Sequence, residues 1–156
     1  MRIHLLAVGT RMPGWVTEAY REYAGRLPAE CSLELREIPS PRRGRNAPVE
    51  RLREEEGERL LAAVPRDCWV VALDEKGRGL DTAGLSRQLD QWMQSGRDVA
   101  LLVGGADGLS DACRARADFK WSLSPLTFPH PLVRVILAEQ IYRGWSLLRN
   151  HPYHRA

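Results

Sequence analysis

The side chains with the most chemistry to offer are gathered in residues 149–155, which read RNHPYHR. Arginines bind phosphate groups, and Tyr153 could stack on an unpaired base, so this segment suits a contact with nucleic acid. His151 and His154 could suggest a metal site, but no acidic residue or cysteine neighbours them, and we expect no metal. A frayed, solvated tail is the other interpretation; the concentration of His, Tyr and Arg favours a functional segment.

A second group of basic side chains, Arg42, Arg43 and Arg45, lies in a stretch rich in proline, glycine and arginine that is typical of a loop. Solvated loop charge is the usual explanation for such residues, and contact with an RNA backbone fits them equally well. The formal net charge of +3 favours a polyanionic partner without establishing one.

Three loops that follow apolar strands could hold a ligand, because open parallel sheets bind ligands beyond the carboxyl ends of their strands. The first loop begins at Leu73, and the second begins at Gly104 and Gly105 within the sequence GGADG. This spacing differs from both the dinucleotide-binding and the phosphate-binding glycine motifs. The glycines would let backbone approach a flat ligand closely, although taken alone they favour a plain strand-to-helix turn.

The third loop, residues 123–130, is stiffened by prolines at 125 and 129, and a further proline follows at 131. Leu126 and Phe128 lie between the first two, so the loop is apolar and short of backbone donors. It could form a wall around an adenine or a thioether, with its remaining amides facing the ring nitrogens. A rigid connector into a buried helix is an equally good interpretation.

The elements that would position these loops alternate between strands and helices along the whole chain. Continuous apolar runs predict strands over residues 3–8, 33–38, 68–73, 98–103 and 121–123, with a turn over 74–79. Helices are predicted to begin near residues 13, 48, 82, 110 and 131, and Pro28 closes the first of them. Strands buried on both faces form parallel sheets, so we predict a single α/β domain over residues 1–156, with a mostly parallel sheet and helices on both faces.

The last predicted helix, from residue 131 to about 149, is apolar most of the way round. Such a helix is buried, either within its own chain or against another subunit. In so small a protein, packing on one face of a sheet would cover only part of its surface. The pattern therefore predicts a homodimer built on this helix.

The remaining composition indicates a cytoplasmic protein without membrane association. The three cysteines are far apart and form no CxxC pair, which argues against a disulfide framework or a zinc knuckle. The apolar run at residues 3–8 is too short for a signal sequence. No run approaches the roughly 20 apolar residues that a membrane span needs.

Longer stretches of the sequence carry a resemblance to a known family. They are LLAVGTRMPGWV from Leu5, PSPRRGRNA from Pro39, LVGGADGLS from Leu102, and WSLSPLTFPHPLVRVILAEQIYRGWSLLRNHPYHR from Trp121. In these blocks the chain resembles, essentially from end to end, the large-subunit ribosomal RNA methyltransferases that modify N3 of a pseudouridine, within the SPOUT superfamily. The resemblance implies a C-terminal deep trefoil knot, a homodimer, and S-adenosyl-L-methionine as the methyl donor. It also implies a substrate in ribosomal RNA, within the large subunit or the assembled ribosome.

Carried over position by position, the resemblance assigns cofactor contacts to the three loops that follow strands. The residues are Leu73, Gly104 with its neighbour Gly105, Leu123, Ser124, Pro125, Leu126, Thr127 and Phe128. The loops chosen from their composition are therefore the loops that the family uses, which favours a binding site over plain connectors.

Methylation at N3 requires removal of the imide proton, and His154 is the candidate base because the ordinary pKa of histidine suits neutral pH. Glu139 is a competing candidate that could instead hold the knot together. Arg155 or Arg149 could stabilise negative charge on the ring oxygens, and Tyr153 could stack on the base. Two other functions stay open: a methyltransferase of the same superfamily that acts on tRNA, and a non-catalytic RNA-binding protein on this scaffold.

Overall fold

The computed structural model describes residues 1–42, 44 and 46–155 and contains one five-stranded sheet. Its strands are β1 (Arg2–Val8), β2 (Ser32–Ile38), β3 (Trp69–Gly79), β4 (Val99–Val103) and β5 (Phe119–Ser122). They lie in the order β2-β1-β4-β3-β5, and every pairing between neighbours is parallel. All five residues of β4 are buried, as expected for a strand covered on both faces. The predicted parallel α/β architecture is confirmed.

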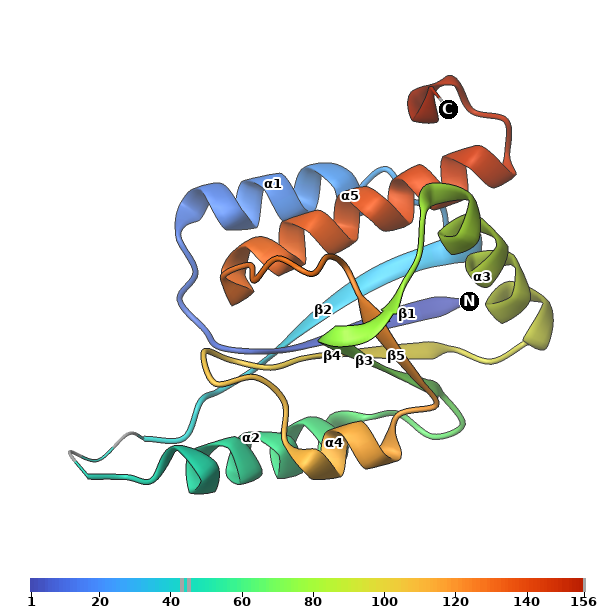
Figure 1. The fold of residues 1–156 in the computed structure, drawn as a ribbon. Coiled ribbons are helices and arrows are strands. Elements are labelled where there is room, and N and C mark those ends of the chain that lie inside the picture. Colours follow the sequence, from blue (N-terminus) through green and yellow to red (C-terminus); the bar gives the residue numbers. More distant parts are fainter. Residues whose placement is uncertain (43, 45, 156) are drawn as a thin grey trace.

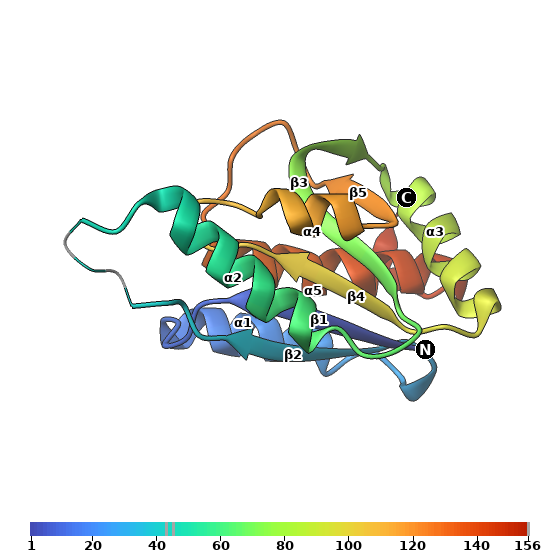
Figure 2. The ribbon, with the colours of Figure 1, turned by 90° about the horizontal axis from the view of Figure 1, so that it is seen from below.

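Helices cover both faces of this sheet (Figures 1 and 2). They are α1 (Gly14–Ala24), α2 (Val49–Ala63), α3 (Thr82–Ser95), α4 (Asp111–Arg116) and α5 (His130–Leu148), with 3₁₀ turns at Ala29–Cys31 and Pro152–His154. On one face α1, α3 and α5 bury Tyr20, Leu89 and Ile141 in a shared core. On the other face α2 and α4 bury Leu60 and Cys113. The sheet is therefore the middle of three layers.

The structure differs from the predicted strands at the outer edge of the sheet. Residues 74–79, predicted as a turn, continue β3 past a bulge, and both Leu73 and Arg78 pair with Trp121 of β5. β5 begins at Phe119 rather than at residue 121. Pairing with a strand far away in the sequence supplies the backbone hydrogen bonds that hold residues 78–79 extended, and no local pattern encodes that pairing.

The first helix is shorter than predicted. It ends at Ala24, and Pro28 instead precedes the turn at Ala29–Cys31. Gly25 follows the last helical residue, and its amide donates to the Arg21 carbonyl oxygen at 2.9 Å. Glycine has a low helix propensity, and residues before a proline avoid helical backbone angles, so the helix stops before the proline is reached.

The last helix, α5, is buried on the side that faces the sheet but not all the way round. Leu137, Ala138 and Ile141 are at most 1% exposed and belong to the core. Four other apolar side chains of α5 are half-buried and lie outside that core: Leu132, Val135, Ile136 and Leu147. Their spacing places them along one side of the helix, and we call them the α5 stripe. One chain therefore covers only part of this apolar helix.

Candidate active site

The three loops predicted to hold a ligand meet at one edge of the sheet. β4, β3 and β5 are neighbours and run parallel, so the residues that follow them lie beyond the same carboxyl edge. Ala72 pairs with Leu102, which brings Leu73 close to the start of the glycine loop, residues 104–109. The proline loop, residues 123–129, leaves β5 at this edge and leads into α5 (Figure 1). The tertiary structure thus brings the three loops together.

The glycine loop is a tight turn whose first position requires glycine. The Gly108 amide donates to the Gly105 carbonyl oxygen at 3.1 Å, and Gly108 has a φ of 78°. A Cβ atom on Gly104 would lie 2.5 Å from the Gly108 carbonyl carbon, and one on Gly105 would lie 3.0 Å from a carboxylate oxygen of Glu56. Close packing of backbone against backbone therefore explains Gly104, and packing against a buried side chain explains Gly105.

The proline loop is fastened to β3 by Glu75, a residue that the sequence pattern does not single out. The Thr127 hydroxyl donates to the Glu75 carboxylate at 2.7 Å. The Ser122 hydroxyl lies 3.0 Å from the Glu75 carbonyl oxygen and 3.1 Å from that of Ser124. Thr127 and Glu75 are 52 positions apart in the sequence, and Ser122 and Glu75 are 47 positions apart. The shape of the loop therefore depends on the bulge in β3.

Beside Leu73, Asp74 is held by two donors. One carboxylate oxygen accepts from the Lys76 amide at 3.0 Å, and the other accepts from Nε of Arg114 at 3.0 Å. Burial alone would raise the pKa of Asp74, but the two donors together outweigh it and hold the pKa below its ordinary value. Asp74 is therefore a carboxylate at neutral pH and ties the bulge of β3 to α4. An acidic residue directly after an apolar strand is the signal that could have identified it.

The backbone of the proline loop offers donors to a ligand. Within residues 1–42, 44 and 46–155, the amides of Leu123, Ser124 and Thr127 donate to no protein acceptor. The side chain of Leu126 is 70% exposed beside them. Unpaired amides next to an exposed apolar side chain suit the ring nitrogens and the flat faces of a nucleoside.

The basic and aromatic segment, residues 149–155, folds back on α5. The Tyr153 hydroxyl donates to Glu139 at 2.9 Å, and the centroids of the Tyr153 and Tyr142 rings are 4.6 Å apart. The Arg143 guanidinium lies 5.0 Å from the centre of the Tyr153 ring. Partial burial and the hydrogen bond to Glu139 raise the pKa of Tyr153 to about 12. Within one chain, Tyr153 therefore packs against α5 and holds the segment in place.

Glu139 is engaged within its own chain. Besides Tyr153, its carboxylate accepts from Nε of Arg143 at 2.9 Å and from the Gln140 side chain at 2.6 Å. Both oxygens are occupied by donors from the protein. This arrangement supports the structural alternative for Glu139 over the role of general base.

His154 and Arg155 are less engaged than Tyr153. The Nδ1 atom of His154 is buried and has no hydrogen-bond partner in the described part of the chain. The backbone carbonyl oxygen of His154 accepts a hydrogen bond from the Arg143 guanidinium at 3.2 Å. Arg155 is exposed and has a φ of 39°, in the left-handed region that side chains rarely adopt. Arg155 therefore keeps a guanidinium free for a ligand, whereas the unpartnered Nδ1 atom of His154 is enclosed by protein within one chain.

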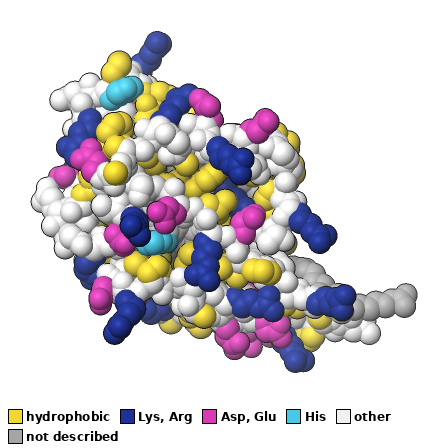
Figure 3. Space-filling model, turned by 180° about the vertical axis from the view of Figure 1, so that it is seen from behind, with side chains coloured by type: hydrophobic (Ala, Val, Ile, Leu, Met, Phe, Trp, Pro, Cys, Tyr) yellow, Lys and Arg dark blue, Asp and Glu magenta, His cyan; other side chains and the backbone are white. Residues whose placement is uncertain are grey.

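Of the other predicted RNA contacts, the structure describes Arg149 and Arg42. Arg149 forms two hydrogen bonds with the Glu30 carboxylate, at 3.1 and 2.9 Å. Arg42 is exposed, and Arg43 and Arg45 lie outside the described residues. On the face shown in Figure 3, lysine and arginine side chains lie interspersed with acidic and apolar ones. That face therefore offers no single extended basic patch.

α5 separates the two halves of the predicted site within one chain. The proline loop joins the start of α5, whereas residues 149–155 follow its end (Figure 1). The segment reaches back along the helix as far as Glu139, which lies nine residues, or roughly 14 Å, from His130, the first residue of α5. In a single chain, the candidate base and the candidate cofactor loops do not meet.

A buried arginine that is absent from the sequence-based predictions joins α5 to the end of β1. Arg134 is 1% exposed, and it donates to the Glu37 carboxylate at 2.6 Å and to the Gly9 carbonyl oxygen at 2.7 Å. Burial, with a further contribution from the Arg134 charge, lowers the pKa of His130. The signal in the sequence is a lone arginine within the apolar run of this helix. Arg134 fixes the start of α5, and with it the end of the proline loop.

Two features are absent from the part of the chain that the structure describes: a cluster of metal-ligating side chains and a long apolar helix. Its His, Cys, Asp and Glu side chains form no group of three or more that could hold a metal ion. Likewise, none of its helices combines the length and the apolar character that a bilayer span requires.

Comparisons with known proteins identify the protein family to which this fold and these loops belong. The family described as "Predicted SPOUT methyltransferase" matches residues 1–154, and the chain belongs to that family. It is 74% identical over 155 residues to the "Ribosomal RNA large subunit methyltransferase H" of Thioalkalivibrio sulfidiphilus, covering 99% of both chains. It is 62% identical over 156 residues to the protein of the same name from Alkalilimnicola ehrlichii, covering 100% of both. The resemblance read from the sequence is confirmed.

Among solved structures, a probable methylase family protein from Haemophilus influenzae has a similar fold. The TM-score is 0.56 at 10% sequence identity, and the match covers 96% of this chain and 67% of that one. At this level of identity the similarity concerns the fold alone.

Proposed function

We propose that this chain transfers a methyl group from S-adenosyl-L-methionine to N3 of a pseudouridine in large-subunit ribosomal RNA. Membership of the SPOUT methyltransferase family supports methyl transfer, and the 74% identical relative is named for the RNA of the large subunit. One structural observation carries the proposal. Leu73, the glycine loop and the proline loop converge at one edge of the sheet and offer unpaired amides there.

The residues at this edge fit the cofactor. The amides of Leu123, Ser124 and Thr127 could bind adenine nitrogens, and Leu73 and Leu126 could cover the ring faces. The remaining proposed contacts are Gly104, Gly105, Pro125 and Phe128. When bound, S-adenosyl-L-methionine supplies a methyl group on a positively charged sulfur that becomes neutral on transfer. The protein therefore contributes mainly alignment, which can lower such a barrier by roughly 7–11 kcal/mol.

The chemistry left to this chain is removal of the imide proton and stabilisation of the resulting charge. We assign removal of the imide proton to His154, because the ordinary pKa of histidine suits this step at neutral pH. Arg155 would stabilise negative charge on the ring oxygens, whereas Arg149 would first have to leave Glu30. Tyr153 and Glu139 hold the segment in shape. If His154→Ala kept full turnover at every pH, this assignment of the base would be wrong.

The two halves of the site meet only when two chains combine, and we propose a homodimer for this reason. The α5 stripe offers apolar side chains before and after the Glu139–Arg143 ion pair along the helix, and Trp15, at the start of the adjoining helix α1, is 58% exposed. Two α5 helices packed antiparallel on this surface would place residues 149–155 of one chain beside the proline loop of its partner. Each site would then combine cofactor loops from one chain with His154 from the other.

Mixed dimers test this arrangement. One chain carries His154→Ala, and the other carries Leu126→Asp, which places a charge in the exposed proline loop. Shared sites predict that mixing the two inactive proteins restores about a quarter of the wild-type activity, because half of randomly paired dimers are mixed and each holds one intact site. Sites built within one chain predict no recovery.

We also propose that the chain is one domain that contains the trefoil knot implied by the resemblance. β5 lies at the margin of the sheet, yet α5, the next element, packs between α1 and α3 (Figure 1). The chain must therefore return across the carboxyl edge, past the ends of β3 and β4. Passage of α5 through those loops would explain why they are packed together. Knots are rare, so the topology could not be proposed from general rules of folding.

Incubation with isotopically labelled cofactor tests the substrate. Large subunits, small subunits, assembled ribosomes and tRNA are offered separately, and the labelled nucleotide is located. We expect label at N3 of a pseudouridine in large-subunit RNA, and none in ribosomes that carry uridine at that position. Label in tRNA would support the related enzyme class, and absence of cofactor binding in a calorimetric titration would support a non-catalytic RNA-binding protein. Because ribosomes are the expected substrate, we propose a cytoplasmic location for this activity.

A further inference from the structure

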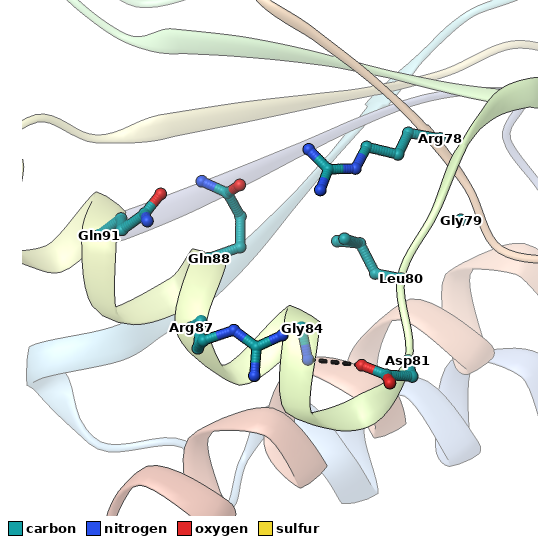
Figure 4. Close-up of a pocket in the computed structure, with 8 residues that line it drawn as sticks. All are labelled: Arg78, Gly79, Leu80, Asp81, Gly84, Arg87, Gln88 and Gln91. Atoms are coloured by element: carbon teal, nitrogen blue, oxygen red, sulfur yellow. Dashed lines mark hydrogen bonds between the residues drawn. The ribbon is translucent and has the colours of Figure 1, made fainter.

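A groove runs along the outer edge of the sheet, between α3 and the paired strands β3 and β5. Its first part is a hollow of about 340 Å³, lined by polar side chains that include Arg78, Arg87 and Gln88 (Figure 4). Its second part is a hollow of about 260 Å³, lined by aromatic side chains that include Trp69 and Phe119. Gln88 and Gln91 line both parts, so the two hollows form one groove.

Four long polar side chains face this groove without partners. Arg87, Gln88 and Gln91 project from one side of α3, and Arg78 extends toward them from β3 (Figure 4). Across the described part of the chain, the side chains of these four residues form no hydrogen bond or ion pair. Two guanidinium groups and two amides are therefore available to a ligand.

The two carboxylates in the groove, by contrast, are engaged by the backbone. Asp81 accepts from the Gly84 amide at 2.7 Å and so caps α3. Asp118 accepts from the Val70 amide at 2.8 Å. Both carboxylates thus have structural partners, whereas the cations of the groove do not. The formal charges of the lining balance, with Arg78 and Arg87 against Asp81 and Asp118, so the groove has no net positive charge. An anionic ligand would be bound by the two unpartnered guanidinium groups themselves.

The groove leads directly from the candidate active site. Gly79, in its lining, pairs with Ser122, the last residue of β5 before the proline loop. A nucleic-acid strand with its target nucleotide at the carboxyl edge could therefore continue into the groove. Half-buried aromatic rings and unpaired arginines along one channel are the combination that holds single-stranded nucleic acid.

We propose that this groove binds the single-stranded RNA that flanks the methylated nucleotide. Arg78 and Arg87 contact phosphates, Gln88 and Gln91 contact base edges, and Phe119 packs against a base. This assignment rests on the proposed function, since it takes RNA as the substrate. It adds a surface that none of the loops at the carboxyl edge provides.

The test compares two double variants of equal charge. Arg78→Gln/Arg87→Gln alters the groove, and Arg21→Gln/Arg51→Gln removes two exposed arginines from α1 and α2. Binding of a fluorescent 12-nucleotide oligouridine is measured over a range of salt concentrations, with cofactor affinity as the check on folding. Each phosphate contact on a single strand contributes about 0.7 to the salt dependence of log K, so the groove variant should lower that slope by about 1.4. Its dissociation constant at low salt should rise roughly tenfold, and the control should match the wild type.

Several outcomes would overturn this assignment. They are equal loss in both double variants, no loss in either, and no binding of oligouridine by the wild-type protein. A loss seen with intact subunits but absent with naked RNA would show that the groove binds a ribosomal protein instead. The proposed function fails separately: it requires the wild type to methylate large-subunit RNA, whichever way the groove variants behave. A 4-thiouridine photocrosslink to the peptide that contains Phe119 would place the RNA directly.

Discussion

The Tyr153 hydroxyl donates a hydrogen bond to the Glu139 carboxylate at 2.9 Å, and this contact holds residues 149–155 against α5. Tyr153→Phe keeps the ring contact with Tyr142 and removes only the hydrogen bond. We expect a loss of about 1 kcal/mol in the free energy of unfolding and a lower turnover number, because the segment that carries His154 becomes less ordered. Denaturant unfolding and methylation kinetics measure the two effects.

Tyr23→Phe is the matched control, because the Tyr23 hydroxyl makes no hydrogen bond to any described residue. It should leave both unfolding and turnover unchanged. Equal effects of the two substitutions would show that the Tyr153–Glu139 contact has no particular role.

The hydrogen bond between Thr127 and Glu75 should govern cofactor affinity. Thr127→Val keeps the shape of the side chain but loses the donor, so the proline loop is no longer fastened to β3 at that point. We expect the dissociation constant for S-adenosyl-L-methionine to rise about tenfold, equivalent to about 1.4 kcal/mol. Isothermal titration measures it. Thr17→Val on α1 serves as the control, and the same weakening in both variants would contradict a role for the loop.

Gly104 should be intolerant of a side chain. A Cβ atom there would lie 2.5 Å from the carbonyl carbon of Gly108, so Gly104→Ala must displace backbone in the glycine loop. We expect a loss of about 1–3 kcal/mol in stability, together with weaker cofactor binding. Gly14→Ala is the control, because a Cβ atom on Gly14 has no neighbour within 4 Å. Thermal unfolding of the two variants should differ clearly, and similar melting temperatures would refute the steric explanation.

Asp74 should make the free energy of unfolding depend on pH in the acidic range. Its pKa in the folded protein lies below its ordinary value, so the folded state binds fewer protons than the unfolded state as the pH falls. The stabilisation is complete above the ordinary pKa of an aspartate, about 4, and is lost below it. Asp74→Asn should therefore be less stable than the wild type at neutral pH, and the difference should shrink toward pH 3.

Glu18→Gln is the control for this pH dependence, because Glu18 is exposed and forms no hydrogen bond or ion pair within the described chain. It should follow the wild-type profile at every pH. A constant difference between Asp74→Asn and the wild type across the acidic range would contradict the assignment to Asp74.

The α5 stripe should hold the proposed homodimer together. Ile136→Asp places a charge in the middle of that stripe, and we expect it to shift the protein toward monomers in sedimentation and to abolish methylation. Val49→Asp is the control, since Val49 is 48% exposed on α2, on the other face of the sheet. If Ile136→Asp stayed dimeric, the subunits would have to associate through a different surface.

The sequence predicts much of the fold because the apolar pattern and the backbone preferences of residues are local properties. The apolar run in β4 and the glycines that follow it indicate a covered strand and a tight loop without knowledge of any partner. The same local patterns indicate the three strand ends as ligand-binding loops, and the resemblance to the family implies S-adenosyl-L-methionine as the ligand. Chain direction alone then requires the ends of parallel neighbours to lie at one edge.

Contacts between distant residues needed the tertiary structure. The sequence pattern predicts that Glu75 lies in a turn, but in the structure it holds the proline loop through Thr127. Arg134 interrupts an apolar run in the sequence, but in the structure it joins α5 to Gly9. The composition of residues 149–155 indicates a functional segment. It does not indicate how far the segment lies from the cofactor loops, because that distance depends on the length and direction of α5. Residue types determine which chemistry is available, and the path of the chain decides which residues meet.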